Sequence, residues 1–371
     1  MQILVIGGSR FVGRAIVQRL LTDGHRVTLF NRGRTPDPFG TRVSRIVGDR
    51  SDQETWHMAL ARRRYDAVID VIASRQEHSR QAAAALAGRT GHFIHISTAS
   101  VYVVREGLYC PFREEDFAGR LLPRTAANKA SWLYAYHKRC CESALQQAWE
   151  HDRFPFTSLR LPMVVGPGDY TERFGAYLER LADGGPILLP EGGLNSWGFL
   201  WVGDIADVVA GNLGNAATFG NAYNLAQREV VSLRQLVEAT ASELDLPARL
   251  VPVPSELLER VGLGTAFSPF SHDHDIILDT AAARRDLLFE PTPFATWCPR
   301  LVADSVTTSG RRPTSFYATR ARELQLVGEL AALRLLPAPQ PPASSASPLR
   351  LRRRLRSRIP AGEVRAPAYL P

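Results

Sequence analysis

The fold is decided by the stretch Ile3-Leu4-Val5-Ile6-Gly7-Gly8-Ser9-Arg10-Phe11-Val12-Gly13, near the start of the chain. Its first four residues form an apolar run that predicts a buried strand, and the amphipathic pattern over 11–22 predicts a helix. Gly7 allows a tight turn between them, and Gly13 allows the helix to pack closely on the strand. The free N–H groups of such a helix N-terminus bind phosphate. The stretch therefore predicts a dinucleotide-binding site.

The residues after the second predicted strand favour NADP over NAD. An NAD-selective site would place Asp or Glu there against the ribose 2′-hydroxyl, but this chain has Asn31 and Arg32. Together with Arg10 they suit a 2′-phosphate. Asp49, after the third strand, is placed to meet the adenine edge. The predicted cofactor contacts are Gly7, Gly8, Ser9, Arg10, Phe11, Val12, Gly13, Asn31, Arg32, Asp49, Arg50, Ile72, Lys138 and Pro162.

Short apolar runs alternate with helical patterns over the first 160 residues. Further strands are expected at 26–30, 43–47, 67–71, 92–96 and 156–161, and helices at 75–87 and 126–149. This alternation is typical of βαβ units, so we expect an α/β protein with a doubly wound parallel sheet, the Rossmann fold. Glycine and proline clusters follow Gly166, with short helices at about 204–213, 232–244 and 255–261. They predict a second, smaller α/β lobe.

We expect three parts along the chain. Residues 1–165 would form the dinucleotide-binding domain, and 166–306 the substrate-binding lobe, interleaved with late strands of the sheet. Residues 307–371 would form a C-terminal extension with one amphipathic helix over 320–336. The segment 337–348, PAPQPPASSASP, precedes an arginine run. Because this composition cannot build a core, we expect disorder from residue 337.

The composition describes an ordinary globular protein. The chain has 371 residues, of which 45% are apolar and 22% charged. No apolar run approaches the about 20 residues of a spanning helix, and no export signal is visible. The four cysteines lack metal-ligand or disulfide spacing. We therefore expect a cytoplasmic protein without membrane association.

The net charge of +8 comes mainly from the tail. Residues 337–371 carry seven arginines and one acid, which is +6 and leaves +2 for the rest of the chain. Clustered arginines of this kind give salt-sensitive, sequence-independent affinity for nucleic acid. Because the rest of the chain is nearly neutral, we do not expect a nucleic-acid partner. Only the arginine-rich tail has the charge to bind one.

One tyrosine–lysine pair has the spacing of an acid–base site. Tyr134 and Lys138 are four residues apart on a predicted helix, and so lie on one face. Of the 45 basic residues only Lys129 and Lys138 are lysines, so Lys138 is chosen where arginine would not serve. A nearby ammonium favours the phenolate and lowers the pKa of a tyrosine. The compact ammonium also suits a bond to the nicotinamide ribose. We therefore expect Tyr134 and Lys138 to be catalytic.

Hydroxyl side chains end the strand predicted before this helix. The segment His92–Tyr102 places Ser97, Thr98 and Ser100 at its carboxyl end. Strand ends of this kind open onto the cofactor crevice in doubly wound sheets. We expect Thr98 to hydrogen-bond a substrate oxygen beside Tyr134, with Ser97 or Ser100 as the alternatives.

Together, these motifs resemble the short-chain dehydrogenase/reductase superfamily, in its extended, NAD-dependent epimerase/dehydratase-like branch. Residues 160–169 and 200–207 are similar to the Arg-Pro-x-x-x-x-Gly-Pro-Gly-Asp and His-Val-x-Asp-x-Ala elements of that branch. The Gly-Gly-x-Arg-Phe-Val-Gly turn, with Asn-Arg-Gly after the second strand, resembles an atypical subgroup. Its members include reductases and the chloroplast stem-loop RNA-binding proteins.

The resemblance covers about residues 1–300 and implies a role for each motif. Tyr134 would be the acid/base, Lys138 its electrostatic partner, and Thr98 the anchor of the substrate oxygen. The glycine turn would hold the pyrophosphate. The chain departs from the family pattern at Arg10, Asp70 and Val103, which stand in place of a glycine, a small or neutral residue and a glycine.

These residues predict an enzyme that moves a hydride between nicotinamide C4 and a secondary alcohol or ketone. The substrate would be sugar-, nucleotide- or natural-product-like. Oxidation or reduction and epimerisation share this step. Dehydration is disfavoured because Ala99 and Ser100 replace the acidic pair that it needs. The candidate substrate contacts are Ser97, Ser100, Asp169, Tyr170, Arg173, Trp197 and Arg300.

Two other classes stay open: a non-catalytic nucleotide-fold protein that binds RNA through the tail, and a redox-sensing regulator that binds cofactor without turnover. The sequence His272-Asp273-His274-Asp275 has no further ligand at metal spacing, so we expect no metal site. The long helix over 126–149 is consistent with pairing in a homodimer.

Overall fold

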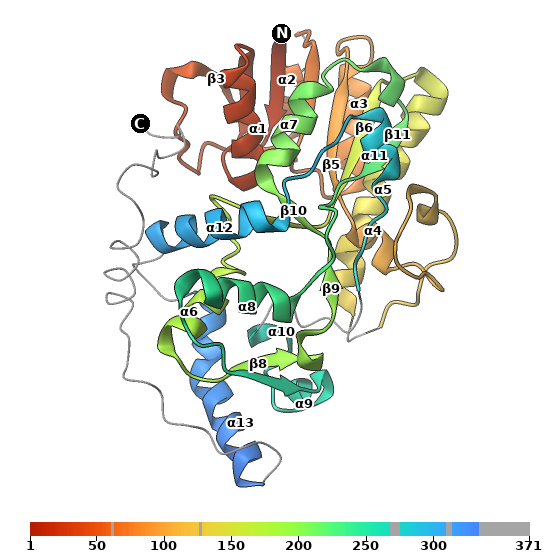
Figure 1. The fold of residues 1–371 in the computed structure, drawn as a ribbon. Helices are drawn as coiled ribbons and strands as arrows, with labels where there is room; N and C mark the ends of the chain where they lie inside the picture. Colours follow the sequence, from red (N-terminus) through yellow and green to blue (C-terminus); the bar gives the residue numbers. More distant parts are fainter. Residues whose placement is uncertain (61–62, 126–127, 268–274, 309–313, 334–371) are drawn as a thin grey trace.

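The computed structural model describes residues 1–60, 63–125, 128–267, 275–308 and 314–333 (Figure 1). The segment from residue 337, where disorder was expected, lies outside the described residues. So do three residues of the His-Asp-His-Asp sequence, 272–274.

A seven-stranded parallel sheet forms the larger lobe, in the order β11-β6-β5-β4-β1-β2-β3. Every neighbouring pair runs parallel, which confirms the predicted fold class. Because the strand order reverses between β1 and β4, a crevice opens at their carboxyl ends. The strands are β1 (Gln2–Ile6), β2 (Arg26–Asn31), β3 (Val43–Val47), β4 (Ala67–Asp70), β5 (Phe93–Thr98), β6 (Phe156–Leu161) and β11 (Asn221–Asn224).

Helices cover both faces of the sheet (Figure 1). On one face α1 (Phe11–Thr22) packs beside α7 (Val202–Gly211), and they share an apolar core with β1 and β5. On the other face α2, α3 and α5 bury a second core against the same strands. These three helices are α2 (Gln53–Leu60), α3 (Gln76–Leu86) and α5 (Lys129–Asp152). Strands buried on both sides explain why their sequences are continuous apolar runs.

A smaller lobe lies below the sheet in Figure 1 and is built mainly from helices around a two-stranded sheet, β8 (Ile187–Pro190) and β13 (Leu250–Val253). A short parallel pair, β7 (Met163–Val165) and β10 (Phe199–Trp201), joins the two lobes. Further elements are α4 (Ser100–Val103), α6 (Gly175–Asp183), β9 (Ser196–Trp197), β12 (Val231–Ser232), α8 (Leu233–Leu244), α9 (Ser255–Arg260), α10 (Gly264–Phe267), α11 (Ala281–Asp286), α12 (Phe294–Thr308) and α13 (Arg320–Ala332).

The helix expected over 320–336 is α13, and it is bound tightly to the smaller lobe. Arg180 of α6 pairs with Glu323 of α13 at 2.5 Å, and both side chains are fully buried. Arg320 donates to both carboxylate oxygens of Asp183 at 2.6 and 2.7 Å. Apolar residues of α13 also pack on those of β8, α9 and α10. Residues after 314 therefore complete the core of this lobe.

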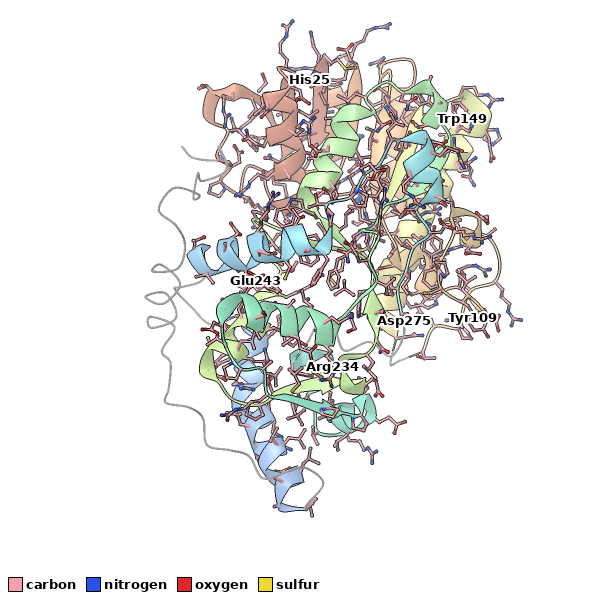
Figure 2. The ribbon with its side chains drawn as sticks, in the orientation of Figure 1. His25, Tyr109, Trp149, Arg234, Glu243 and Asp275 are labelled. Carbon is pink, nitrogen blue, oxygen red and sulfur yellow. The ribbon has the colours of Figure 1, made fainter. Side chains whose placement is uncertain are left out.

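The side chains in Figure 2 show how far the two lobes extend. His25 precedes the first residue of β2, at the amino-terminal end of that strand, and Trp149 lies near the end of α5. Arg234 and Glu243 belong to α8 of the smaller lobe.

No described helix is long and apolar enough to cross a membrane.

Candidate active site

A cavity of about 720 Å³ lies at the carboxyl ends of the parallel strands. Its wall includes the turn between β1 and α1, the ends of β2 to β5, and two residues of α5. It brings together every predicted cofactor contact. These are Gly7, Gly8, Ser9, Arg10, Phe11, Val12, Gly13, Asn31, Arg32, Asp49, Arg50, Ile72, Lys138 and Pro162.

The glycine turn is shaped to receive a phosphate. Gly7 and Gly8 have φ values of 107° and 92°, which side chains rarely tolerate. A Cβ on Gly13 would lie 2.8 Å from the Cα of Gly8, so the first turn of α1 rests directly on the loop. Gly7 N–H also donates to the carbonyl of Phe30 at 2.9 Å, which ties the loop to β2. This cradle at a helix N-terminus fits the pyrophosphate of a dinucleotide.

A methyl group added at Gly13 should distort the phosphate-binding turn. Gly13→Ala is expected to weaken NADPH binding about tenfold or more, because overpacking of this order costs about 1–3 kcal/mol. Gly211→Ala is the matched control, since a Cβ at this position of α7 has no neighbour within 4 Å. Fluorescence titration with NADPH measures both. Wild-type affinity in the Gly13 variant would show that the turn does not hold the cofactor.

The structure explains how Arg10 replaces the glycine usual at its position. Its φ is −133° and its ψ is 151°, an extended conformation that needs no glycine. The side chain is exposed, and its guanidinium lies over the Tyr170 ring, 5.3 Å from the centroid. Arg10 and Tyr170 both line the cavity. This contact therefore joins the glycine turn to the loop after β7.

The end of β2 presents a polar, basic surface to the cavity. The Asn31 amide donates to the Ser9 hydroxyl at 3.1 Å and accepts from Gly33 N–H at 2.8 Å. The Ser51 N–H bonds to Asp49 and, with the charges of Arg32 and Arg34, lowers the pKa of that carboxyl. Asp49 thus stays ionised beside two arginines.

Arg50 and Asp70 form a buried pair below the cavity. The guanidinium donates to both carboxylate oxygens, at 2.9 and 3.0 Å. Burial raises the pKa of Asp70, but the Arg50 charge and several hydrogen bonds outweigh it and hold the pKa below its usual value. The structure thus commits the Arg50 guanidinium to Asp70. The same pairing explains the unusual acid on the fourth strand, since each residue compensates the other.

Tyr134, Lys138 and Thr98 meet in the cavity, as the sequence predicts. Lys138 Nζ is buried and donates to the Ile96 carbonyl at 2.9 Å, which leaves two of its N–H donors. Tyr134 is 49% exposed because its ring faces the cavity. The Thr98 hydroxyl opposes the rise in the pKa of Tyr134, and it donates to the Ser100 hydroxyl at 3.2 Å.

In the free protein, Lys138 is not among the groups that shift the pKa of Tyr134. Burial raises the pKa of Tyr134, and the groups that oppose this are the Thr98 hydroxyl and the Arg173 charge. The Lys138 ammonium is instead held by the Ile96 carbonyl. The pKa of Tyr134 therefore lies above its ordinary value, and the phenol is neutral at pH 7.

The predicted substrate contacts are spread more widely. Arg173 and Tyr170 line the cavity, as does Ser97, whose hydroxyl donates to Glu142. The other four do not line it. Ser100 hydrogen-bonds Thr98, Asp169 accepts from Thr171, Trp197 is buried in the core of the smaller lobe, and Arg300 lies on α12.

The sequence did not predict a buried network of polar side chains that holds α5, the helix of Tyr134 and Lys138, against the sheet. Glu142, one turn after Lys138, pairs with Arg160 of β6 at 2.7 Å. Arg160 donates to the Tyr102 hydroxyl at 2.6 Å, which donates to Asn224 of β11 at 2.7 Å. The four-residue spacing of Lys138 and Glu142 was the available signal. Their helix is thereby fixed against β5, β6 and β11.

Metal ligands do not gather in the described part of the chain. No group of three or more His, Cys, Asp or Glu side chains there is arranged to hold a metal ion. Of the His-Asp-His-Asp sequence only Asp275 is described, and its carboxylate accepts from the Ser196 N–H at 2.7 Å.

Two curated proteins are similar to the chain at the level of sequence. It is 27% identical over 259 residues to the chloroplast stem-loop binding protein of 41 kDa b from Arabidopsis thaliana, which covers 66% of the chain and 64% of that protein. The match thus spans less than two thirds of that relative. The chain is also 28% identical over 262 residues to 2'-dehydrokanamycin reductase from Streptomyces kanamyceticus. This match covers 69% of the chain and 70% of the reductase.

Solved structures share the fold at low sequence identity. UDP-glucose 4-epimerase from Thermotoga maritima, with UDP-glucose, matches with a TM-score of 0.66 at 17% identity over 83% of this chain and 99% of the epimerase. The dTDP-glucose 4,6-dehydratase from Bacillus anthracis, in complex with NAD, matches with a TM-score of 0.66 at 17% identity over 83% and 97%. A model of the NAD dependent epimerase/dehydratase family matches residues 3–226, more than half of the sequence. The chain therefore belongs to the NAD dependent epimerase/dehydratase family.

Proposed function

We propose that this protein is an NAD(P)-dependent oxidoreductase or epimerase that transfers a hydride at a secondary alcohol or ketone of a small molecule. One observation carries the proposal. The phosphate-binding turn, Tyr134, Lys138 and Thr98 all line one cavity at the switch point of the sheet. The similarity to a reductase supports the same class.

Tyr134, Thr98 and Lys138 each have a different role in the proposed reaction. A bound nicotinamide supplies or accepts the hydride. Tyr134 gives the proton to the substrate oxygen in reduction and takes it in oxidation. The Thr98 hydroxyl orients that oxygen, and the two remaining donors of Lys138 bind the ribose hydroxyls. Because Lys138 Nζ donates a hydrogen bond to the Ile96 carbonyl at 2.9 Å, the position of the ammonium is fixed before the cofactor binds.

Reduction or epimerisation fits these residues better than dehydration. Dehydration needs an additional acid and base beside the substrate, but the positions after Thr98 are Ala99 and Ser100. Ala99 is buried, and the Ser100 N–H caps the Thr98 hydroxyl at 3.2 Å. The site thus provides Tyr134 as its proton-transfer group. We propose a sugar-, nucleotide- or natural-product-like substrate.

We further propose that the cofactor is NADP. Asn31, Arg32 and Arg34 line the cavity after β2, where an acid would bind a ribose diol and repel a 2′-phosphate. Guanidinium groups bind phosphate in bidentate fashion. Asp49, the acid on this wall, is flanked by the same arginines.

A single substitution tests this preference. Arg32→Ala is expected to weaken NADPH binding by about 10- to 100-fold and to leave NADH binding unchanged, because a charged hydrogen bond is worth about 1.5–3 kcal/mol. Arg26→Ala is the matched control, since Arg26 is exposed at the opposite end of the same strand. Calorimetric titration with each dinucleotide measures the affinities. An equal loss for NADH and NADPH would contradict 2′-phosphate recognition.

A further inference from the structure

Arg173 is a cation without an obvious partner at the catalytic end of the cavity. It precedes α6, is half-buried and lines the cavity together with Tyr134. Its Nη1 donates to Met163 Sδ at 3.1 Å, and sulfur is a weak acceptor. None of the ion pairs among the described residues includes Arg173. Most of its five N–H donors therefore remain available.

Four other arginines in sheltered positions are each neutralised by an acid. This holds in the sheet lobe and in the smaller lobe alike. The pairs are Arg50 with Asp70, Arg160 with Glu142, Arg180 with Glu323, and Arg320 with Asp183. Arg173 has no such acid in the described part of the chain. Buried Arg139 also lacks one there, but it donates to the carbonyls of Val101 and Phe117, whereas Arg173 faces the cavity.

The other cations of the cavity wall have either an acidic partner or an expected place beside the dinucleotide. Six basic residues line the cavity, and within the described chain Asp49 is its sole acidic lining residue. Arg10, Arg32 and Arg34 lie at the glycine turn and after β2, beside the expected phosphates. Arg50 is neutralised by Asp70, and Lys138 is placed to meet the ribose. Arg173 is the cation left over.

We propose that Arg173 binds an anionic group of the substrate, a carboxylate or a phosphate, next to the carbon that is oxidised or reduced. This inference rests on the proposed function and specifies its substrate class. A guanidinium is suited to both anions because its fork makes two parallel hydrogen bonds.

Anion binding at Arg173 would also act on the pKa of the catalytic phenol. In the free protein the Arg173 charge lowers the pKa of Tyr134 and so opposes the effect of burial. A bound anion would neutralise that charge, so the pKa of Tyr134 would rise further and the phenol would stay protonated. A protonated Tyr134 is the proton donor that ketone reduction requires. The substrate anion would thus keep Tyr134 in the form that reduction uses.

The binding test avoids any need for turnover. The protein is first saturated with NADPH, which occupies the phosphate sites, and is then titrated calorimetrically with oxamate and with oxamide. Oxamate carries a carboxylate beside a carbonyl that is not reduced, and oxamide is its uncharged counterpart. We expect oxamate to bind the wild type at least about tenfold more tightly than oxamide does.

Three variants assign this difference to Arg173. Arg173→Gln should lose the preference for oxamate, and Arg173→Lys should retain part of it. Arg80→Gln should retain all of it, because Arg80 is exposed on α3 outside the cavity wall. Equal oxamate affinity in Arg173→Gln and the wild type, or no oxamate binding by the wild type, would overturn the inference.

Turnover separates this inference from the proposed function. NADPH oxidation is measured with ketones that carry a carboxylate and with their methyl esters. We expect Arg173→Gln to lower kcat/KM about 10- to 100-fold for the acids and little for the esters. An equal effect on both would overturn the inference. Intact oxamate binding without oxidation of NADPH by any ketone would contradict the proposed function instead.

Discussion

Replacing Tyr134 with Phe is expected to lower the rate constant of hydride transfer by about 10²- to 10⁴-fold while leaving the Kd for NADPH unchanged. Tyr134 lines the cavity together with Thr98 and Lys138. Phe keeps the ring but cannot move a proton to or from the substrate oxygen. Single-turnover oxidation of bound NADPH measures the rate, and fluorescence titration measures the affinity.

The pH dependence should identify the same phenol. Burial raises the pKa of Tyr134, so the neutral form persists above pH 7. Reduction needs this neutral form and should hold its rate through neutral pH, falling only when the phenol ionises. Oxidation needs the phenolate and should therefore accelerate as the pH rises. Both dependences should disappear in Tyr134→Phe.

Tyr136→Phe is the control for this experiment. Tyr136 lies on the same helix, stacks on Trp132 at 4.9 Å and does not line the cavity. Its variant should match the wild type in rate and pH profile. A wild-type rate in Tyr134→Phe would remove Tyr134 from the chemistry.

Glu323→Ala is expected to lower the free energy of unfolding by about 3–5 kcal/mol, because it leaves the buried guanidinium of Arg180 without its counter-ion. Arg180 and Glu323 are both fully buried, and the pair joins α6 to α13. Arg180 would keep its bonds to the carbonyls of Ala176 and Phe267, which do not neutralise it. Guanidinium denaturation monitored by tryptophan fluorescence measures the change.

Glu329→Ala on the same helix is the matched control. Glu329 is half-exposed, and its nearest cation, Arg322, lies 3.7 Å away. An exposed pair of this kind contributes about 0–1 kcal/mol. If Glu323→Ala is no more destabilising than Glu329→Ala, then α13 is not an integral part of the smaller lobe.

Local patterns predict the parallel sheet and the glycine turn because these features depend on neighbouring residues. The apolar run after Met1 becomes β1, and the amphipathic residues 11–22 become α1 over the predicted range. The helix expected over 126–149 is α5, Lys129–Asp152, so its core was predicted and its ends were not. Helix ends depend on caps and tertiary contacts that periodicity does not report.

Long-range pairs were harder to predict. Asp70 appeared only as a departure from the family pattern, and its partner, Arg50, is 20 residues away. Glu142 and Arg160 meet only when α5 folds onto β6. Four-residue spacing places Tyr134 and Lys138 on the same face of the helix but does not reveal that the Ile96 carbonyl accepts from Lys138. Desolvation depends on the assembled cavity rather than on spacing.

The central claim is that a dinucleotide lies in this cavity with its nicotinamide against Tyr134. A crystal structure of the protein with NADPH tests it most directly. We expect the pyrophosphate on the N-terminus of α1, the 2′-phosphate beside Arg32, and nicotinamide C4 facing the hydroxyls of Tyr134 and Thr98. A dinucleotide bound elsewhere, or one whose nicotinamide ring points away from Tyr134, would contradict the account.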